Sequence, residues 1–340
     1  MNPRGMLSVY SLFSGSGGNC TYVSCCGSGI LIDAGASAAG IRRELVKLGT
    51  DFDRISAVFV THEHADHTKG LPVIAKNYGI PIHMTEPSAR MLRTTEPLSA
   101  CLVVHPLLYS ANVPYLTVRS FVTPHDSAAC VGYRITSSGG DTCAIATDLG
   151  RITNHVLEGL IGCRSVILEC NHDVDMLRHN ASYPRPLRER ILSGNGHLSN
   201  DACAACAAYL AEHGTQNIML AHLSADNNTP QTALEAVAKK LTVPVHLTAA
   251  KPAEIVPLTD RTDREELLLN EDGIGVRHLS PAAENGRKAY DAEASGQNTE
   301  KYEADATMKE RDAAAADAMS DTVNPDEATR DGRGQPLAVG

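Results

Sequence analysis

One short stretch of the sequence carries four good metal ligands within seven residues. It reads Thr-His-Glu-His-Ala-Asp-His over residues 61–67, and an apolar β-type run over residues 55–60 leads directly into it. Residues i and i+2 of a helix point roughly 200° apart, so His62 and His64 cannot share a helical face. They converge if the stretch is a turn that leaves the end of a strand. Asp66 and His67 then lie at the start of the next helix.

The residue types and spacing favour a pair of metal ions. We expect one ion to be held by His62 and His64 and a second by Asp66 and His67. Imidazole and carboxylate ligands suit zinc, manganese or iron, and ions about 3.5–4 Å apart are the usual hydrolytic arrangement. The alternative is a histidine-rich surface loop, which the preceding buried strand disfavours.

Four later strand-like runs also end in polar residues. A rigid sheet holds a site by placing ligand-type side chains just beyond its strands. Any one of these exits has an ordinary explanation, but four together indicate a common site. The runs are residues 115–122, followed by His125; residues 142–147, followed by Asp148; residues 165–168, followed by Glu169, Asn171 and His172; and residues 217–221, followed by His222.

A glycine- and serine-rich loop, residues 14–19, separates two expected strands, Leu7–Phe13 and Cys20–Cys25. Its backbone N–H groups would suit a phosphate, which makes Ser16 and Asn19 candidate substrate contacts. The alternative is an ordinary turn between strands. Asp33, at the end of the next strand, either braces the histidine loop by a hydrogen bond or only forms a turn before Gly35.

Periodicity predicts the other elements that position these residues. Helices are expected where apolar residues recur at helical spacing, and strands where short apolar runs are bounded by turn residues. The expected helices cover residues 37–48, 68–78, 87–92, 151–161, 186–192, 199–213 and 231–241. The further expected strands cover residues 30–32, 80–84, 101–104, 131–136 and 243–247.

Composition bounds the location of the protein. No run of eighteen apolar residues occurs, so no transmembrane helix is expected, and the N-terminus lacks the apolar segment of a secretory signal. A cytoplasmic protein without a membrane partner follows. The ten cysteines mostly lie in apolar contexts and are expected to stay reduced as small core residues. Cys203 and Cys206 have redox-motif spacing, but core packing is favoured there too.

The acidity of the chain belongs to its C-terminal part. Residues 259–340 hold 10 Lys and Arg against 19 Asp and Glu, a net charge of −9, whereas the whole chain carries −10. We expect a catalytic domain over residues 1–258, a short structured extension over residues 259–280, and a disordered, acidic, alanine-rich tail over residues 281–340. The composition does not indicate a basic nucleic-acid-binding surface.

Taken together, these motifs resemble those of the metallo-β-lactamase-fold hydrolases, and within them the YycJ/WalJ-like branch of nucleases. The similarity spans about residues 6–257 and is carried by ordered stretches. The resemblance implies an αββα sandwich with the metal site at one sheet edge, and 5′-directed exonuclease activity on DNA. The stretches are residues 14–19, 61–67, 171–177, 196–200 and 221–224, with His125 and Asp148 between them.

The resemblance also implies a ligand set. By position, one ion would take His62, His64 and His125. The other would take Asp66, His67 and His222, with Asp148 bridging. The aspartate at position 148, where zinc β-lactamases use cysteine, and the Gly-Tyr-Arg-Ile run at residues 132–135 are similar to phosphodiesterases of the superfamily. The inserted clamp domain and the flexible arm of the RNA-processing relatives have no counterpart in this sequence.

The expected mechanism is hydrolysis of a phosphodiester. Two cations, Zn²⁺ or Mn²⁺, would hold a bridging hydroxide that attacks the phosphate, and Asp66 would orient it. His197, paired with Glu169, would deliver the proton to the leaving oxygen, because a carboxylate neighbour keeps an imidazole protonated. Alternatively, His197 only supports the helix start beside Ser199. His172 either contacts the substrate phosphate or only caps a turn.

Three classes of function remain. The first is a DNA exonuclease, with DNA favoured over RNA as the nucleic-acid partner. The second is a small-molecule hydrolase of the same fold that acts on thioesters or cyclic nucleotides. The third is a metal-binding regulatory protein without turnover. Asn171 joins Ser16, Asn19 and His172 as a candidate substrate contact, and Tyr183, Arg185 and Arg188 belong either to a nucleic-acid groove or to a plain surface loop.

Overall fold

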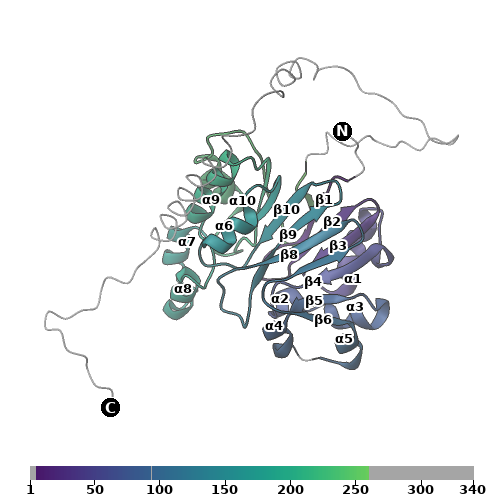
Figure 1. The fold of residues 1–340 in the computed structure, drawn as a ribbon. Helices are drawn as coiled ribbons and strands as arrows, with labels where there is room; N and C mark the ends of the chain where they lie inside the picture. Colours follow the sequence, from purple (N-terminus) through teal and green to yellow (C-terminus); the bar gives the residue numbers. More distant parts are fainter. Residues whose placement is uncertain (1–4, 93, 260–340) are drawn as a thin grey trace, which may run out of the picture. The chain divides into compact units, whose positions relative to one another are not determined.

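The computed structural model describes residues 5–92 and 94–259 (Figure 1). The expected disordered tail, residues 281–340, lies outside the described residues, and so does the expected extension beyond Thr259.

Two seven-stranded sheets form the centre of the described fold. Each sheet combines an antiparallel part with a run of parallel strands, β3 to β6 in the first sheet and β10 to β13 in the second. The first sheet has the order β14 (Val256–Pro257), β1 (Ser8–Phe13), β2 (Cys20–Cys25), β3 (Ser28–Ile32), β4 (Ile55–Phe59), β5 (Ile82–Thr85), β6 (Leu102–His105). The second has the order β13 (His246–Ala249), β12 (Asn217–Ala221), β11 (Ser165–Glu169), β10 (Thr142–Ala146), β9 (Val131–Ser137), β8 (Leu116–Val122), β7 (Ser110–Val113).

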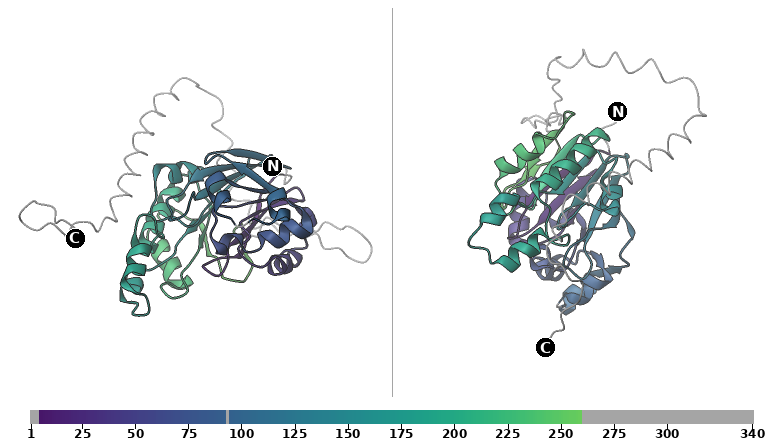
Figure 2. Two further views of the ribbon diagram at one scale, coloured as in Figure 1. Left: turned by 90° about the horizontal axis from the view of Figure 1, so that it is seen from below. Right: turned by 90° about the vertical axis from the view of Figure 1, so that its left-hand side faces the viewer.

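Helices lie outside both sheets, as the further views also show (Figure 2). Those of the N-terminal half accompany the first sheet, and those of the C-terminal half the second. The first group is α1 (Ala38–Lys47), α2 (Ala65–Thr68), α3 (Leu71–Tyr78), α4 (Glu86–Met91) and α5 (Glu96–Cys101), with a 3₁₀ turn at Phe52–Arg54. The second group is α6 (Asn154–Leu160), α7 (Val174–His179), α8 (Arg185–Leu192), α9 (Asn200–Glu212) and α10 (Pro230–Ala238).

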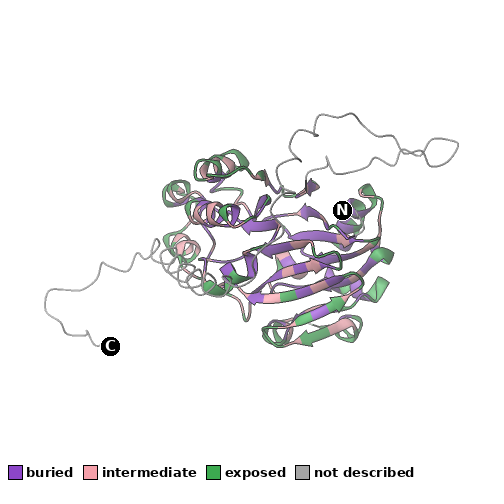
Figure 3. Cartoon of the chain, turned by 45° about the horizontal axis from the view of Figure 1, so that its top comes forward, coloured by how far each residue is buried: buried purple, intermediate pink, exposed green. Residues whose placement is uncertain are grey.

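Three apolar clusters hold these layers together. Alternate residues of a strand face opposite sides of the sheet, so each sheet has one face toward the other sheet and one toward its helices. Val9, Phe59 and Ile145 belong to the cluster between the sheets. The other two clusters lie between each sheet and its helices. Figure 3 shows the buried residues running along the strands and the exposed ones on the outer helices. The predicted four-layer αββα sandwich is confirmed.

Several predicted elements differ from the observed ones. The helix expected over residues 68–78 begins later, at Leu71, and Thr68 is instead the last residue of α2; Gly70 between them packs against the backbone of Ala36, where a Cβ would meet the carbonyl oxygen at 2.6 Å. Tyr115, expected to start a strand, has a φ of +65° in the turn between β7 and β8. The last predicted strand of the second sheet is shifted to His246–Ala249. The short elements β7, α5, α7 and β14 were not predicted.

All ten cysteines lie in the described part of the chain and are free thiols, as predicted. Cys203 and Cys206 lie on the buried face of α9, which agrees with a packing role. No helix among residues 5–92 and 94–259 combines the length and the apolar character that a membrane crossing requires.

Candidate metal centre

The candidate site lies where strands of both sheets end. Asp33 follows β3, and the histidine motif follows β4. In the second sheet Asp148 follows β10, Glu169 ends β11 and His222 follows β12. The carboxyl ends of parallel strands meet at one edge of a sheet, which is where ligands bind in such folds. The polar exits predicted from the sequence therefore come together.

Three of these residues have left-handed backbone conformations. The φ angles are +63° for Asp33, +59° for Asp148 and +56° for His222. Non-glycine residues adopt this region at a cost, and aspartate and histidine tolerate it better than most. Each of the three residues turns the chain directly after a strand. The turns aim the side chains across the sheet edge instead of along the strand.

The seven predicted ligand residues form overlapping clusters. In each cluster one possible ligand atom per residue lies within 4.8 Å of the others. The sequence predicted the grouping of His62 and His64 in a strand-end turn, with Asp66 and His67 in the next helix, and the residues lie there. The clusters are His62, His64 and His125; Asp66, His67 and His222; His62, His67 and Asp148; and Asp148, Glu169, His197 and His222.

Unsatisfied polar atoms test whether these residues fit a cation. His62 Nε2 and His222 Nε2 are buried and have no hydrogen-bond partner among the described residues, and buried Asp148 Oδ2 has no partner there beyond its ion-pair contact with His67. Buried polar atoms are normally paired, and an unpaired one indicates a bound partner such as an ion. The three atoms belong to residues of the clusters, and imidazole and carboxylate are common ligands of divalent transition metals. The residues fit divalent cations.

The charges at the site point the same way. Burial opposes protonation of His67, but Asp148 and Asp33 outweigh it and raise the pKa of His67 well above its usual value. Burial likewise lowers the pKa of His222, but Asp148 and the neighbouring carboxylates of Asp66 and Glu169 outweigh it and raise this pKa to about 10. The carboxylates thus stabilise positive charge at the buried cluster, which is the electrostatic condition for binding cations there.

Asp33 braces the histidine motif, which was one of two roles expected for it. Its Oδ1 atom accepts a hydrogen bond from the backbone N–H of Thr61 at 2.8 Å, and its Oδ2 atom lies 2.8 Å from Nδ1 of His67. The contact at Nδ1 leaves Nε2 of His67 directed at the cluster, 3.2 Å from Asp148 Oδ2. A carboxylate behind a histidine in this way fixes the orientation of the ring.

The loop that carries His125 is held by Glu63, a role that sequence reasoning missed. Glu63 Oε1 accepts from the backbone N–H of Ala128 at 2.8 Å, and Oε2 accepts from Ser88 Oγ of α4 at 2.7 Å. On the other side, His125 Nδ1 lies 3.0 Å from the carbonyl oxygen of Gly196. The sequence carries no signal for this role, because Glu63 meets Ala128 across 65 positions.

His197 and Glu169 lie together, as predicted. Nδ1 of His197 is 2.7 Å from Glu169 Oε1. The same oxygen is 2.9 Å from Nδ1 of His222. Burial lowers the pKa of His197, but Glu169 outweighs it and the net shift is upward. Glu169 is fully buried, whereas 22% of the His197 side chain is exposed, so this histidine is accessible from solvent.

The four candidate substrate contacts lie in different environments. Ser16 is exposed. Asn19 is buried, and its Nδ2 donates to Asp66 Oδ2 at 3.3 Å, so it supports a candidate ligand. Asn171 donates to the carbonyl oxygen of His222 at 2.8 Å. His172 is 1% exposed, and neither ring nitrogen has a hydrogen-bond partner among the described residues.

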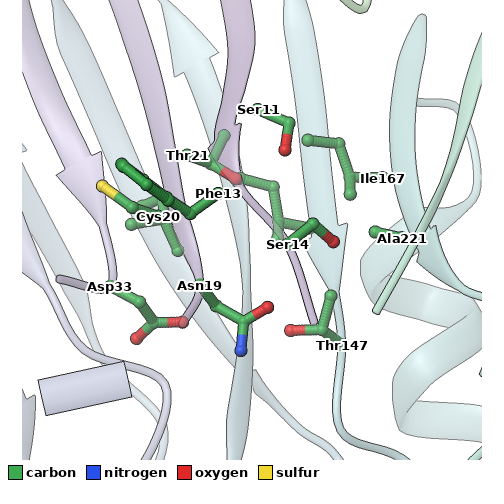
Figure 4. Close-up of a pocket in the computed structure, with 12 residues that line it drawn as sticks. Ser11, Phe13, Ser14, Asn19, Cys20, Thr21, Asp33, Thr147, Ile167 and Ala221 are labelled. Carbon is green, nitrogen blue, oxygen red and sulfur yellow. The ribbon is translucent and has the colours of Figure 1, made fainter. Parts of the chain in front are cut away.

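A small pocket lies between the sheets, and Asn19 is among the residues that line it (Figure 4). Asp33 and Asn19 line one part of it, and Ser14 and Thr147 another. Ser14 Oγ accepts the backbone N–H of His222 at 2.8 Å, which fixes the left-handed turn that aims this histidine. The sequence predicted a role for Ser16 of the same loop but none for Ser14.

Comparison with known proteins gives matches at the levels of family, sequence and fold. Residues 29–223 match the family described as the beta-lactamase superfamily domain. Exodeoxyribonuclease YycJ of Bacillus anthracis is 32% identical over 234 residues, which cover 68% of this chain and 87% of the relative. Exodeoxyribonuclease WalJ of Streptococcus pneumoniae serotype 2 (strain D39 / NCTC 7466) is 30% identical over 226 residues, covering 65% and 83%.

Solved structures share the fold at lower identity. The metallo-β-lactamase fold protein YhfI of Bacillus subtilis superimposes with a TM-score of 0.57 at 16% identity, over 74% of this chain and 98% of that one.

Proposed function

The chain belongs to the β-lactamase superfamily and is a metal-dependent hydrolase, and we propose that it is a DNA exonuclease that degrades its substrate from the 5′ end. The observation that carries the proposal is the clustering of histidines and carboxylates at the ends of strands from both sheets. The names of the relatives YycJ and WalJ, both exodeoxyribonucleases, support DNA as the substrate. We assign the catalytic domain to residues 1–258, which the burial of Leu258 against the first sheet supports.

We assign two ions, Zn²⁺ or Mn²⁺, to this centre. His62, His64 and His125 would hold one, and Asp66, His67 and His222 the other. Asp148 would lie between them, since its carboxylate is close to His67 and to His222. When bound, the ions would supply an activated water and would neutralise charge on the phosphate.

The side chains around this centre have separate tasks. Asp66, with 24% of its side chain exposed, would accept a hydrogen bond from the attacking water and orient it. His197 would donate its Nε2 proton to the leaving oxygen, because Glu169 occupies Nδ1 and favours the protonated ring. Asn19 keeps Asp66 in place through the bond from its amide.

The substrate contacts come from the loop after β1 and from the residues after β11. Ser16, on the exposed side of its loop, would contact the phosphate through its hydroxyl or backbone N–H. Asn171 and His172 follow β11 beside Glu169, and the unpartnered ring nitrogens of His172 favour a role toward substrate over the capping of a turn. Asp173 itself caps α7, by accepting from the N–H of Met176.

A cytoplasmic location is also proposed. The ten free thiols, all within the described residues, support it, because disulfides are rare in that compartment and common outside it.

The test is cleavage of end-labelled single- and double-stranded DNA and RNA by the metal-loaded protein, with Asp66→Ala as the control. We expect stepwise loss of nucleotides from the 5′ end of DNA, and little cleavage by the variant. A protein that cleaves thioesters or cyclic nucleotides but no DNA would be the small-molecule hydrolase instead. The net charge of about −1 that remains for residues 1–258 favours that candidate. Binding of metal without any turnover would leave a regulatory protein.

A further inference from the structure

Helix α8 has no fully buried residue although it lies beside the candidate metal centre; Leu187, Ile191 and Leu192 are half-buried, and four of its residues, among them Arg185, are exposed. A surface helix of a globular protein normally buries an apolar face. By comparison α9 buries seven residues, among them Cys203 and Leu210. Figure 1 shows α7 and α8 at the margin of the helical layer, beyond α6 and α9. The apolar face of α8 is therefore only half-buried, and its other face is open to solvent.

Hydrogen bonds attach the end of α8 to the site. The backbone N–H of His197, the assigned proton donor, donates to the carbonyl oxygen of Ile191 at 3.0 Å. The N–H of Gly196 donates to Ser193 at 2.9 Å, and Arg190 pairs with Asp126, the residue after His125. The helix is thus a fixed neighbour of the catalytic loop.

The charge of this region differs from that of the domain as a whole. Residues 174–192 hold four arginines against two acids, Asp175 and Glu189. The guanidinium group binds phosphate with two parallel hydrogen bonds and stays charged at any working pH. The four arginines are Arg178, Arg185, Arg188 and Arg190.

The arginines divide into two pairs by their contacts. Arg188 donates to the carbonyl oxygen of Arg178 at 2.7 Å and ties α8 to α7, while Arg190 is paired with Asp126. These two are occupied within the protein. Arg178 is exposed and has no ion pair with an acid among the described residues. Arg185 is 82% exposed, and its partner Glu189, one turn further along the helix, is 59% exposed, so the pair is exchangeable with solvent ions.

We infer that α7 and α8 form the surface that binds the phosphate backbone of the nucleic acid next to the metal centre, with Arg178 and Arg185 as phosphate contacts. The inference rests on the proposed nuclease function and specifies where its substrate runs. It explains how a domain of nearly balanced charge would hold a polyanion, since affinity depends on the phosphates contacted locally rather than on net charge. Glu189 then acts against binding, because it competes for Arg185.

The test is the salt dependence of DNA binding. The metal-loaded full chain is titrated with a labelled single-stranded oligonucleotide whose phosphorothioate linkages resist cleavage, at several salt concentrations. We expect Arg178→Ala and Arg185→Ala each to weaken binding by about 3- to 10-fold at low salt and to reduce the slope of log K against log salt by about 0.7. Glu189→Gln should change affinity in the opposite direction and strengthen binding.

Arg54→Ala is the matched control. Arg54 is 67% exposed and precedes β4, whereas the histidine motif follows the other end of the same strand. Its removal takes away one positive charge without touching α7 or α8, and binding should stay as in the wild type.

Turnover of a small diester, bis(p-nitrophenyl) phosphate, separates binding from chemistry. It should be unchanged in Arg178→Ala and Arg185→Ala, because neither side chain reaches the reacting atoms in this assignment. A wild-type protein that cleaves DNA while both variants keep the wild-type affinity and slope would overturn the inference and leave the proposed function standing. Equal losses on the small diester would overturn it too. A wild type that neither binds nor cleaves nucleic acid would overturn both.

Discussion

Oε1 of Glu169 lies 2.7 Å from Nδ1 of His197. The same oxygen also lies 2.9 Å from Nδ1 of His222, so one buried carboxylate joins the assigned proton donor to an assigned metal ligand. Each histidine can therefore be replaced on its own, whereas Glu169 cannot be replaced without affecting both histidines. His197 can be removed without touching a ligand, whereas a change at Glu169 affects both neighbours.

Replacing His197 isolates the proton transfer. We expect His197→Ala to lower kcat on DNA by about 10²- to 10⁴-fold, the range for loss of a general acid, with metal content unchanged. Single-turnover cleavage together with elemental analysis of the same samples measures both quantities. Normal turnover in the fully loaded variant would show that the proton comes from elsewhere.

Replacing Glu169 should affect metal binding as well as turnover. Glu169→Gln keeps the size of the side chain but removes the charge that orients His222, and such supporting groups typically contribute 10- to 100-fold in metal affinity. Competition with a chromophoric chelator measures the affinity of each ion. His197→Ala serves as the comparison, since it should lower turnover alone. Equal metal affinity in the two variants would argue against a role of Glu169 behind His222.

Glu63 offers a test of how the His125 loop is held. Its carboxylate bonds both Ala128 N–H and Ser88 Oγ, and the loop brings His125 to His62 and His64. We expect Glu63→Ala to weaken the three-histidine site by about 10- to 100-fold and to spare the site of Asp66, His67 and His222. Co²⁺ titration followed by its visible spectrum resolves the two sites.

Two further variants interpret that result. Glu63→Gln keeps an acceptor for Ala128 and should restore most of the affinity. Glu96→Ala, an exposed acid at the start of α5, removes the same charge elsewhere and should change nothing. A fall in melting temperature in Glu63→Ala with both metal affinities intact would assign Glu63 to stability alone.

The sequence was informative where the signal is local. The spacing of His62, His64, Asp66 and His67 lies within one turn of chain, so strand-end geometry followed from it directly. Apolar runs also predicted the long strands and therefore the polar residues at their ends. Elements of two to six residues such as β7, α5 and β14 give too short a period to be recognised.

The contacts that support the candidate ligands could not be predicted from the sequence, because they join residues far apart in the chain. Glu63 meets Ala128 across 65 positions, and Ser14 meets His222 across 208. Such contacts depend on how two loops pack once both sheets have formed. The left-handed conformation of His222 likewise has no local sequence signal, because the hydrogen bond that stabilises it runs from its N–H to Ser14, 208 positions away.

The pair His83 and His105 predicts a dependence of stability on pH. Their ring nitrogens lie 2.9 Å apart, and burial, followed by the charge of His105, lowers the pKa of His83 to about 4. The unfolded chain, with a histidine pKa near 6.5, binds more protons than the folded protein between these values. Stability is therefore lost as the pH falls from about 6.5 to about 4, by about 1–2 kcal/mol after allowing for solvent screening.

Urea unfolding of wild type and His83→Gln at pH 7 and pH 4.5, with a chelator present, measures this contribution. The candidate metal centre also titrates in acid, but it is common to both proteins and cancels in the difference. We expect the variant to gain stability relative to wild type at the lower pH. A difference in unfolding free energy that is equal at both pH values would exclude this role of His83.

Gly35 is the position where the smallest substitution should disturb the metal centre most. A Cβ at this residue would lie 1.5 Å from the carbonyl oxygen of Asp66 and 2.6 Å from the backbone nitrogen of Asn19. The N–H of Asn19 donates to that same carbonyl oxygen at 2.7 Å, and the N–H of Gly35 donates to Asn19 at 2.8 Å. Three backbone segments thus pack together, and only a hydrogen atom fits between them.

We expect Gly35→Ala to destabilise the fold by about 3 kcal/mol or more and to lower affinity for the ion assigned to Asp66, since the backbone of Asp66 must move. Calorimetric melting and metal titration measure the two effects. Gly17→Ala is the matched control, because it lies in the neighbouring loop, nothing stands within 4 Å of its added Cβ, and its φ needs no glycine. If Gly35→Ala melted and bound metal like Gly17→Ala, Asp66 would not depend on this close approach, and its position would have to be fixed by Asn19 and the helix α2 alone.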